Sequence, residues 1–303
     1  MRESSNPVMR GVIRDNQPAP YAGFGQAIPG AQQAAWSAGQ QQANPYQQPG
    51  QQDFVQAPTS SRQITIDDVV MKTGMTLAVL IAVAVAVYAA IATRGADLVG
   101  TAQTNAQVAL AMPLLLVGSI GGLVLVLIAS FGRKQDNPAI VLAYAAFQGL
   151  FVGSISFVFA NLAVAEGTSA GAMIGQAVLG TIGVFVGMLI VYKVGAIRVT
   201  PRFTRMLMAG MVGVLVLVLG NLVLGLFGVD MGIRSGGPIA IIFSLVCIAL
   251  AAFSFLLDFD AADKLVKAGA PEKAAWGVAL GLTVTLVWLY VEILRLLSYL
   301  NSD

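Results

Sequence analysis

Seven long apolar stretches constrain the fold of this chain more than any other feature of the sequence. They lie at about residues 73–93, 110–131, 138–164, 171–192, 206–228, 238–257 and 276–298. A helix of about 20 apolar residues crosses the roughly 30 Å of hydrocarbon in a bilayer. Because backbone groups find no water there, such segments form helices that satisfy their own hydrogen bonds. The sequence therefore predicts an all-α membrane protein whose residues 63–303 form a bundle of seven transmembrane helices.

Composition supports this fold class and excludes several functions. Of the 303 residues, 57% are apolar and 11% are charged, whereas soluble domains carry about 25% charged residues. A net charge of +2 is too small to indicate a nucleic-acid partner. The chain has no histidine, which excludes histidine-ligated zinc and Ser-His-Asp catalysis, and its last apolar stretch lacks the lysine of a retinal pump. We therefore expect neither an enzyme nor a resident cofactor.

Residues 1–62 differ from the rest because they are rich in Gln, Ala, Pro and Gly. Such a segment buries too little apolar surface to offset the entropy of ordering it, so we expect a disordered cytoplasmic tail. Its start lacks the apolar core of a signal peptide. Trp36 and Tyr46 could contact a partner protein, although a low-complexity linker is the simpler interpretation.

Lysine and arginine are distributed unevenly between the loops, and this predicts an orientation. With the N-terminus in the cytoplasm, the inside segments hold most of the basic residues: Arg2, Arg10, Arg14, Arg62, Lys72, Arg133, Lys134, Lys193, Arg198, Arg202, Arg205, Lys264, Lys267 and Lys273. The outside loops hold only Arg94 and Arg234. The positive-inside rule therefore predicts a multi-pass protein of the plasma (inner) membrane with its N-terminus cytoplasmic and its C-terminus outside.

Small residues within the apolar stretches indicate close helix packing. Gly149-Leu-Phe-Val-Gly153 and Gly183-Val-Phe-Val-Gly187 both have the GxxxG spacing that lets two helix backbones approach. The spacing is common in membrane helices, so it predicts packing and identifies no partner.

Glu292 is the one acid deep within an apolar stretch. An ionisable group in hydrocarbon costs about 2.5 to 3.5 kcal/mol, which favours a functional interpretation. Arg295 follows on the same helical face, so a buried structural ion pair is the alternative. Burial and a nearby cation act in opposite directions on the proton affinity of a carboxyl. A proton- or cation-linked role and a structural pair both stay open.

Asp258, Asp260 and Asp263 form the densest acid cluster, at the predicted cytoplasmic end of the sixth apolar stretch. If the helix continues, Asp258 and Asp260 face different ways, whereas Asp260 and Asp263 share a face. As a cation site, their oxygens would favour Ca²⁺ or Mg²⁺ over zinc. The alternative is an acidic helix end balanced by Lys264 and Lys267.

Two segments resemble a known family. The first is Leu289-Tyr-Val-Glu-Ile-Leu-Arg-Leu-Leu297 and the second is Leu256-Leu-Asp-Phe-Asp260. With six upstream helices, they resemble the Bax inhibitor-1 (YccA/TMBIM) family over about residues 64–300. Ser4-Ser-Asn-Pro7 and the Gln-rich tail look like its actinobacterial branch. The family has Leu-Tyr-Leu-Asp where this chain ends its motif in Glu292, so a glutamate replaces an aspartate.

The resemblance implies a bundle around a central C-terminal helix and a pH-sensitive calcium leak. It also implies that an acid on helix six and one on helix seven share a proton, and by motif these are Asp258 and Glu292. Arg133 is the nearest match to a basic residue that latches the helix-six acid in some relatives. If the turn lies near Gly269, Glu292 lies about 12 residues further from it than Asp258, or roughly 18 Å along a helix. Direct pairing of Asp258 with Glu292 then requires that helix six runs deeper, or that helix seven has a cytoplasmic extension before Trp276.

Two functions therefore stay open. The first is a pH-gated cation leak in the lipid bilayer, with Ca²⁺ as the transported ion. The second is a stress-related membrane regulator that binds a protease or another partner protein through residues 1–62. The sequence does not decide between conduction and regulation.

Overall fold

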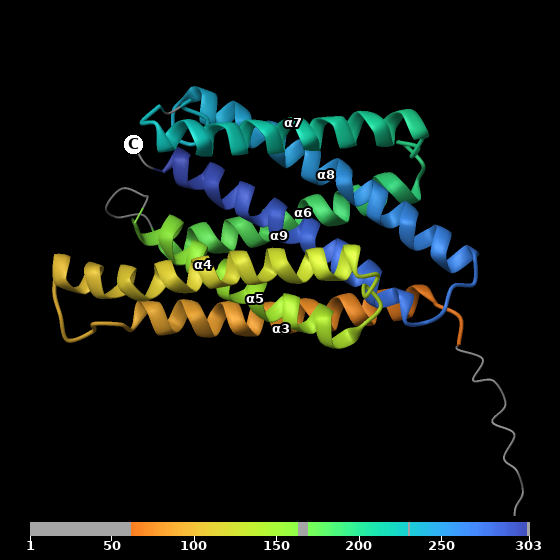
Figure 1. The fold of residues 1–303 in the computed structure, drawn as a ribbon, viewed down its shortest axis with the longest axis horizontal. Helices are drawn as coiled ribbons and strands as arrows, with labels where there is room; N and C mark the ends of the chain where they lie inside the picture. The colour runs from red at the N-terminus through yellow and green to blue at the C-terminus, as the bar shows by residue number, and fades with distance from the viewer. Residues whose placement is uncertain (1–61, 163–168, 230, 302–303) are drawn as a thin grey trace, which may run out of the picture. The chain divides into compact units, whose positions relative to one another are not determined.

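The computed structural model describes residues 62–162, 169–229 and 231–301, and within them it contains helices and no strands. Seven helices there are long and apolar enough to cross a membrane: α3 (Ile66–Ala92), α4 (Thr101–Phe131), α5 (Pro138–Phe157) with its π-helical continuation η1 (Val158–Leu162), α6 (Ala170–Lys193), α7 (Pro201–Leu226), α8 (Pro238–Lys267) and α9 (Ala274–Leu300). Figure 1 shows them as a bundle. The predicted all-α, seven-helix fold class is confirmed. The predicted tail lies outside the described residues, apart from Arg62.

Local sequence signals set several helix ends. The side chain of Thr65 caps α3 by accepting a hydrogen bond from the Asp68 amide, and the Asp68 carboxylate accepts one from the Thr65 amide in return. This reciprocal capping box satisfies two amides that have no partner inside the helix. Asn137 caps α5 in one direction only, because its side chain accepts a hydrogen bond from the Ala139 amide. Gly269 adopts a left-handed φ of 63° after α8, so the turn lies at the position that the sequence analysis assumed for it.

Helix α8 runs further than hydropathy predicts, past residue 257 to Lys267. Its charged last turns are stabilised by two ion pairs at (i, i+4) spacing, Asp260 with Lys264 and Asp263 with Lys267. Asp258 therefore lies within a helix that continues for more than two further turns, and the helix axis fixes the direction of its side chain.

The C-terminal helix α9 is the central element, as predicted from the family resemblance. It packs against α3, α5, α6 and α8, and 67% of its most apolar segment is buried inside the protein. Helix α7 is the opposite case, because 6% of its corresponding segment is buried and it packs mainly on α8. In Figure 1, α7 lies at the edge of the bundle. Most of its apolar surface therefore faces lipid.

The two GxxxG motifs behave differently. A Cβ atom at Gly149 would lie 2.7 Å from the carbonyl oxygen of Leu80, and one at Gly153 would lie 2.5 Å from that of Ala84. These glycines therefore let α5 approach the backbone of α3, as the motif predicts. Nothing lies within 4 Å of the corresponding positions at Gly183 and Gly187. In the described part of the chain, the packing interpretation thus holds for the first motif and not for the second.

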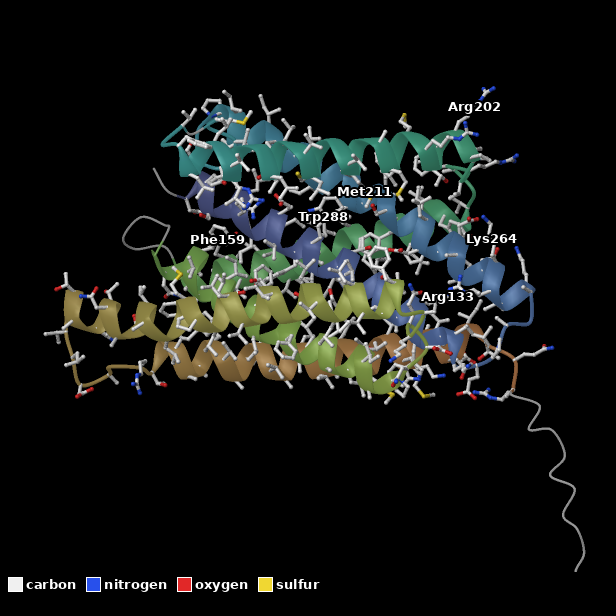
Figure 2. All side chains as sticks on the ribbon, viewed as in Figure 1. Arg133, Phe159, Arg202, Met211, Lys264 and Trp288 are labelled. Carbon is white, nitrogen blue, oxygen red and sulfur yellow. The ribbon has the colours of Figure 1, made fainter. Side chains whose placement is uncertain are left out.

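Basic side chains gather at one end of the bundle. Figure 2 shows Arg133, Arg202 and Lys264 at the same end, whereas Phe159 lies toward the other. These three residues come from the end of α4, the start of α7 and the last turns of α8. The separation of charge that the sequence predicts is therefore present in the fold.

Candidate functional site

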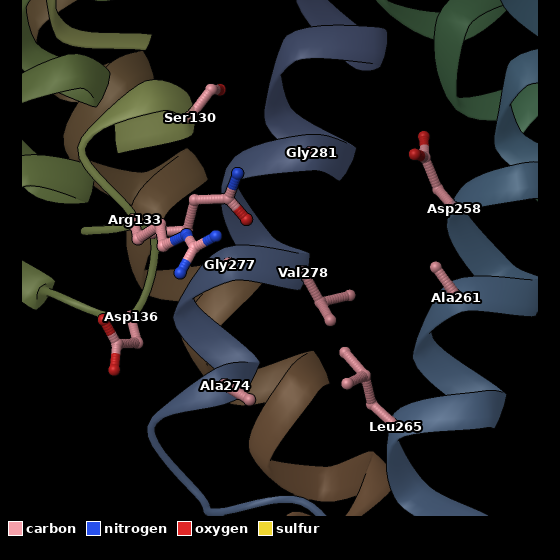
Figure 3. A pocket seen from close by; sticks show the side chains of 11 residues that line it. Ser130, Arg133, Asp136, Asp258, Ala261, Leu265, Ala274, Gly277, Val278 and Gly281 are labelled. Atoms are coloured by element: carbon pink, nitrogen blue, oxygen red, sulfur yellow. The ribbon is translucent and has the colours of Figure 1, made fainter. Parts of the chain in front are cut away.

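A cavity of about 450 Å³ lies at the basic end of the bundle, between the α4–α5 connection and the facing parts of α8 and α9. Figure 3 shows its lining. Arg133 and Asp136 come from the connection, Asp258 comes from α8, and Gly277 and Gly281 come from the first turns of α9. Because two lining positions on the central helix carry no side chain, space remains between α9 and its neighbours at this end.

Asp258 faces this cavity from α8 and is half-buried. Its Oδ2 accepts a hydrogen bond from Oγ1 of Thr285 on α9, at 2.7 Å. A Cβ atom at Gly281 would lie 3.6 Å from Oδ1, so α9 passes the carboxylate closely there. The helix-six acid is therefore held by a neutral hydroxyl of the central helix. Thr285 was missed by the sequence analysis, which looked only for an acidic partner.

Glu292 lies elsewhere on α9, where it pairs with Arg295. Nη1 of Arg295 donates to Oε1 of Glu292 at 2.7 Å, and the two side chains are 10% and 5% exposed. Thr285, which marks the level of Asp258 on α9, precedes Glu292 by two turns, or roughly 10 Å. The structure therefore does not bring Asp258 and Glu292 together. It forms the Glu292–Arg295 pair that the sequence leaves open as an alternative.

The motif-based pairing fails for a geometric reason. The turn at Gly269 and the continuous helix through Lys267 fix how far α8 runs back along α9. With that connection, Asp258 contacts α9 at Thr285, about two helical turns before Glu292. Whether either acid senses pH stays a prediction.

Arg133 lines the same cavity as Asp258, and no ion pair joins the two within the described residues. Arg133 directly follows Gly132, the C-cap residue of α4, and adopts a left-handed φ of 51°. The next amide, that of Lys134, donates to the carbonyl of Ala129 at 3.0 Å, which closes a Schellman-type helix end. Glycine usually occupies this position, because a Cβ atom is strained in the left-handed region. The predicted latch residue is thus at the cavity, held on a strained turn.

Asp260 and Asp263 do not form a common site with Asp258. Each pairs with a lysine of its own helix, Lys264 and Lys267 respectively. Among residues 62–162, 169–229 and 231–301, no group of three or more His, Cys, Asp or Glu side chains could hold a metal ion. The three aspartates thus do not converge, and the structure favours the alternative of an acidic helix end balanced by lysines.

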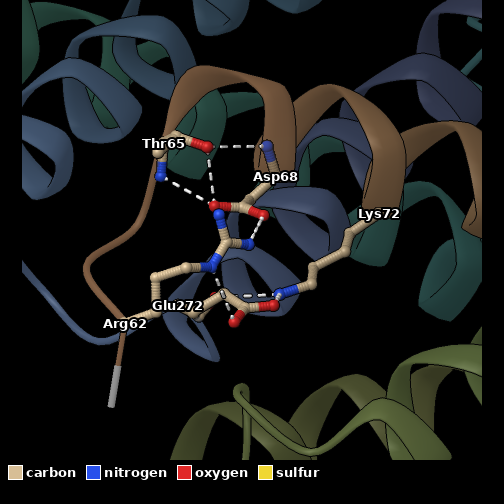
Figure 4. Close-up of polar contacts among 5 residues, drawn as sticks. All are labelled: Arg62, Thr65, Asp68, Lys72 and Glu272. Atoms are coloured by element: carbon tan, nitrogen blue, oxygen red, sulfur yellow. Dashed lines mark hydrogen bonds and ion pairs between the residues drawn. The ribbon is translucent and has the colours of Figure 1, made fainter. Parts of the chain in front are cut away.

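A polar network closes the same end of the bundle, and the sequence analysis missed it. Figure 4 shows Arg62 between the carboxylates of Asp68 and Glu272, with Lys72 on the other side of Glu272. Nζ of Lys72 donates to Oε1 of Glu272 at 3.1 Å and to its backbone carbonyl at 3.0 Å. The amide of Glu272 donates to the Arg62 carbonyl at 2.8 Å. The start of α3 is therefore tied to the connection between α8 and α9.

Two carboxylates outside the helices are stabilised in their ionised form. The hydrogen bond from Lys72, followed by that from Arg62, holds the pKa of Glu272 below its usual value. In the same way, the hydrogen bond from Lys273 lowers the pKa of Asp136. That contact, 2.8 Å long, joins the α4–α5 connection to the start of α9 beside the cavity. No single-sequence signal marks these pairs, because their partners lie far apart in the chain.

Comparison with known proteins agrees with this fold. A family model described as "Bax inhibitor 1 like" matches residues 30–302, which include all seven helices. A search of curated proteins found no match. The resemblance that rests on the last two helices is thus confirmed at the level of the family, whereas the actinobacterial branch stays a prediction.

Proposed function

Because this chain belongs to the Bax inhibitor 1-like family, we propose that it is a pH-sensitive cation leak with Ca²⁺ as the transported ion. The observation that carries the proposal is Asp258, a half-buried carboxylate that faces a cavity from within a helix that continues to Lys267. Oxygen ligands suit Ca²⁺. Asp258 does not converge with two other acids on a metal site within the described residues, and this suits conduction, because an ion that is bound weakly can also leave.

Proton binding to Asp258 supplies the pH sensitivity. Ionised, the carboxylate adds a negative charge to a wall that also carries Arg133 and Asp136, and it attracts cations into the cavity. Protonated, it loses that charge. Thr285 donates to the carboxylate, and this hydrogen bond favours the ionised form. We therefore expect cation flux to fall as the pH falls.

The orientation follows from the same end of the bundle. Arg133, Arg202 and Lys264 lie at the end that holds the cavity. The positive-inside rule then supports a cavity facing the cytoplasm of a plasma (inner) membrane, with the C-terminus on the outer side. In this arrangement Asp258 responds to cytoplasmic pH.

The test is calcium-dye flux into liposomes that hold the purified protein, scanned from about pH 6 to 8. Wild type is expected to conduct with a pH dependence that Asp258→Asn abolishes, because the amide does not titrate. Thr285→Val is expected to move the midpoint toward higher pH, because the ionised form loses its donor. Thr283→Val is the matched control, since its hydroxyl donates to the Ala279 carbonyl of its own helix.

Two outcomes decide against the proposal. A silent wild type in liposomes that hold folded protein contradicts conduction and favours the regulator instead. A flux whose pH dependence survives Asp258→Asn contradicts the assignment of the titrating group.

A further inference from the structure

A second cavity, of about 590 Å³, lies between α7, α8 and α9 and reaches the α7–α8 connection. Its walls are mainly apolar and include Met211 of α7 and Trp288 of α9, which Figure 2 labels. Three charged side chains also line it: Glu292 and Arg295 from α9, and Arg234 from the α7–α8 connection. The cavity therefore combines a long apolar wall with a charged end.

Only one of the two oxygens of the Glu292 carboxylate has a hydrogen-bond partner among the described residues. Oε1 accepts from Arg295, whereas Oε2 is buried and has no hydrogen-bond partner among the described residues. The side chain is 5% exposed, so bulk water does not solvate it. Buried carboxylate oxygens are nearly always hydrogen-bonded, because leaving one unpaired is costly. An occupant of this cavity should therefore bring a hydrogen-bond donor to Oε2.

The charged end also carries an excess of positive charge. Arg234 lies close enough to Arg295 and Glu292 for their charges to act on it, and no ion pair of Arg234 is formed within the described chain. Two guanidinium groups and one carboxylate leave one net positive charge. Guanidinium binds phosphate through two parallel hydrogen bonds, so an anionic phosphate complements this end.

The position of the cavity favours an occupant from the membrane. Helix α7 packs mainly on α8, and Leu207 is its only buried residue in the described structure. The cavity thus lies between α9 and α7, the helix with the smallest share of its apolar segment buried inside the protein. Glu292 lies eight residues before the end of α9 at Leu300, roughly 12 Å along the helix. A head group near this helix end can reach Glu292 while its chain lies along the apolar wall.

We propose that this cavity binds one membrane phospholipid whose head group carries both a phosphodiester and a primary ammonium. The ammonium donates to Oε2 of Glu292, the phosphodiester accepts from Arg234 and Arg295, and an acyl chain fills the space beside Met211 and Trp288. A choline lipid has the same phosphodiester but no N–H donor. An anionic glycerol lipid has the phosphodiester without the ammonium charge.

The experiment is lipid competition, read by native mass spectrometry of the full chain from nanodiscs of equal ethanolamine, choline and glycerol phospholipid. We expect one ethanolamine lipid to be retained about tenfold over the choline lipid, the factor that one charge-assisted hydrogen bond supplies. Glu292→Gln should remove this preference. Arg234→Gln should reduce the retention of all three lipids, and it changes a connection rather than the helical core.

The matched control is Arg94→Gln, in the other described connection at this end of the bundle, which should leave retention unchanged. Equal retention of ethanolamine and choline lipids by wild type overturns the assignment of the ammonium to Glu292. Retention of no lipid by the wild type overturns the site itself. Because Arg234→Gln leaves Glu292 and Arg295 in place, a folding defect of the Glu292 variant does not hide the result.

Discussion

At the residue scale, the central point is that Asp258 and Glu292 have different partners. Asp258 is held by the Thr285 hydroxyl beside one cavity, and Glu292 is held by Arg295 beside another. Two carboxyls that share a proton titrate as a coupled pair. Asp258 and Glu292 lie about two helical turns apart and have separate partners, so the geometry does not supply such a shared proton.

The first prediction separates the two acids. Glu292→Gln should leave the midpoint of the pH-dependent calcium flux within about 0.3 pH units of wild type, because the group lies outside the Asp258 cavity. The measurement is the same liposome flux assay. A midpoint shift as large as that of Asp258→Asn would restore the coupled pair that the family resemblance implies.

The second prediction concerns the strained turn at Arg133. Arg133→Gly should stabilise the protein by about 1 kcal/mol, because glycine adopts the left-handed φ of 51° without strain. Arg133→Ala keeps the Cβ atom and should bring no such gain. Thermal unfolding in detergent compares the two variants. Equal stability of the glycine and alanine variants would mean that backbone strain is not stored there.

If Arg133 also acts on the cavity through its charge, both variants should change calcium flux to the same extent, since both remove the guanidinium. This comparison separates the electrostatic role of the residue from its backbone conformation.

At the element scale, close contact between α3 and α5 depends on two glycines, whereas the second glycine motif is free of such contact. Gly149 and Gly153 lie against backbone carbonyls of α3, and Gly183 and Gly187 have open space around them. The same GxxxG spacing thus gives close helix packing on α5 and no such packing on α6 within the described residues.

The third prediction uses this contrast. Gly153→Ala should destabilise the bundle by about 1 to 3 kcal/mol, because its Cβ atom would lie 2.5 Å from the Ala84 carbonyl oxygen. Gly183→Ala should be neutral or slightly stabilising, because it meets nothing and alanine favours a helix. Thermal unfolding of both variants is the measurement. A comparable loss in Gly183→Ala would point to a contact with a further protein copy on α6.

The fourth prediction concerns the tie between α3 and the α8–α9 connection. The folded-state pKa of Glu272 lies below its ordinary value of 4.5, so its contacts stabilise the fold fully above that pH. This contribution declines below pH 4.5 and is lost once the pH falls through the lower folded-state value. Hydrogen-exchange protection at the start of α3, taken relative to the intrinsic exchange rate at each pH, should therefore decrease in acid. Glu272→Gln, which does not titrate, should show low protection already at neutral pH and a smaller acid step, because Asp68 still loses its contacts with Thr65 and Arg62 in acid.

At the scale of the whole molecule, the cavity with Asp258 and the cavity with Glu292 are separate and share the central helix α9 as a wall. The first carries the proposed leak and the second the proposed lipid site. Which aqueous compartment each cavity faces depends on the orientation of the basic end.

The fifth prediction tests that orientation. In a Cys247→Ala background, which removes the single cysteine, Lys134→Cys should react with a membrane-impermeant thiol reagent only from the cytoplasmic side. Ser235→Cys, in the α7–α8 connection, should react only from the outside. Labelling of intact cells and of inverted vesicles reads both positions. The reverse pattern would place the Asp258 cavity on the outer face.

The sequence by itself determined the number of transmembrane helices, the basic end of the bundle and the membership of a family, because hydropathy, charge and short motifs are local properties of a chain. It left the turn near Gly269 as a condition and the Glu292–Arg295 pair as an open alternative. Only the tertiary structure decided that Asp258 meets Thr285, that Lys72 and Arg62 hold Glu272, and that Arg234 joins Glu292 at a cavity. Those partners depend on how far one helix slides and turns against another, which side-chain packing fixes and hydropathy does not.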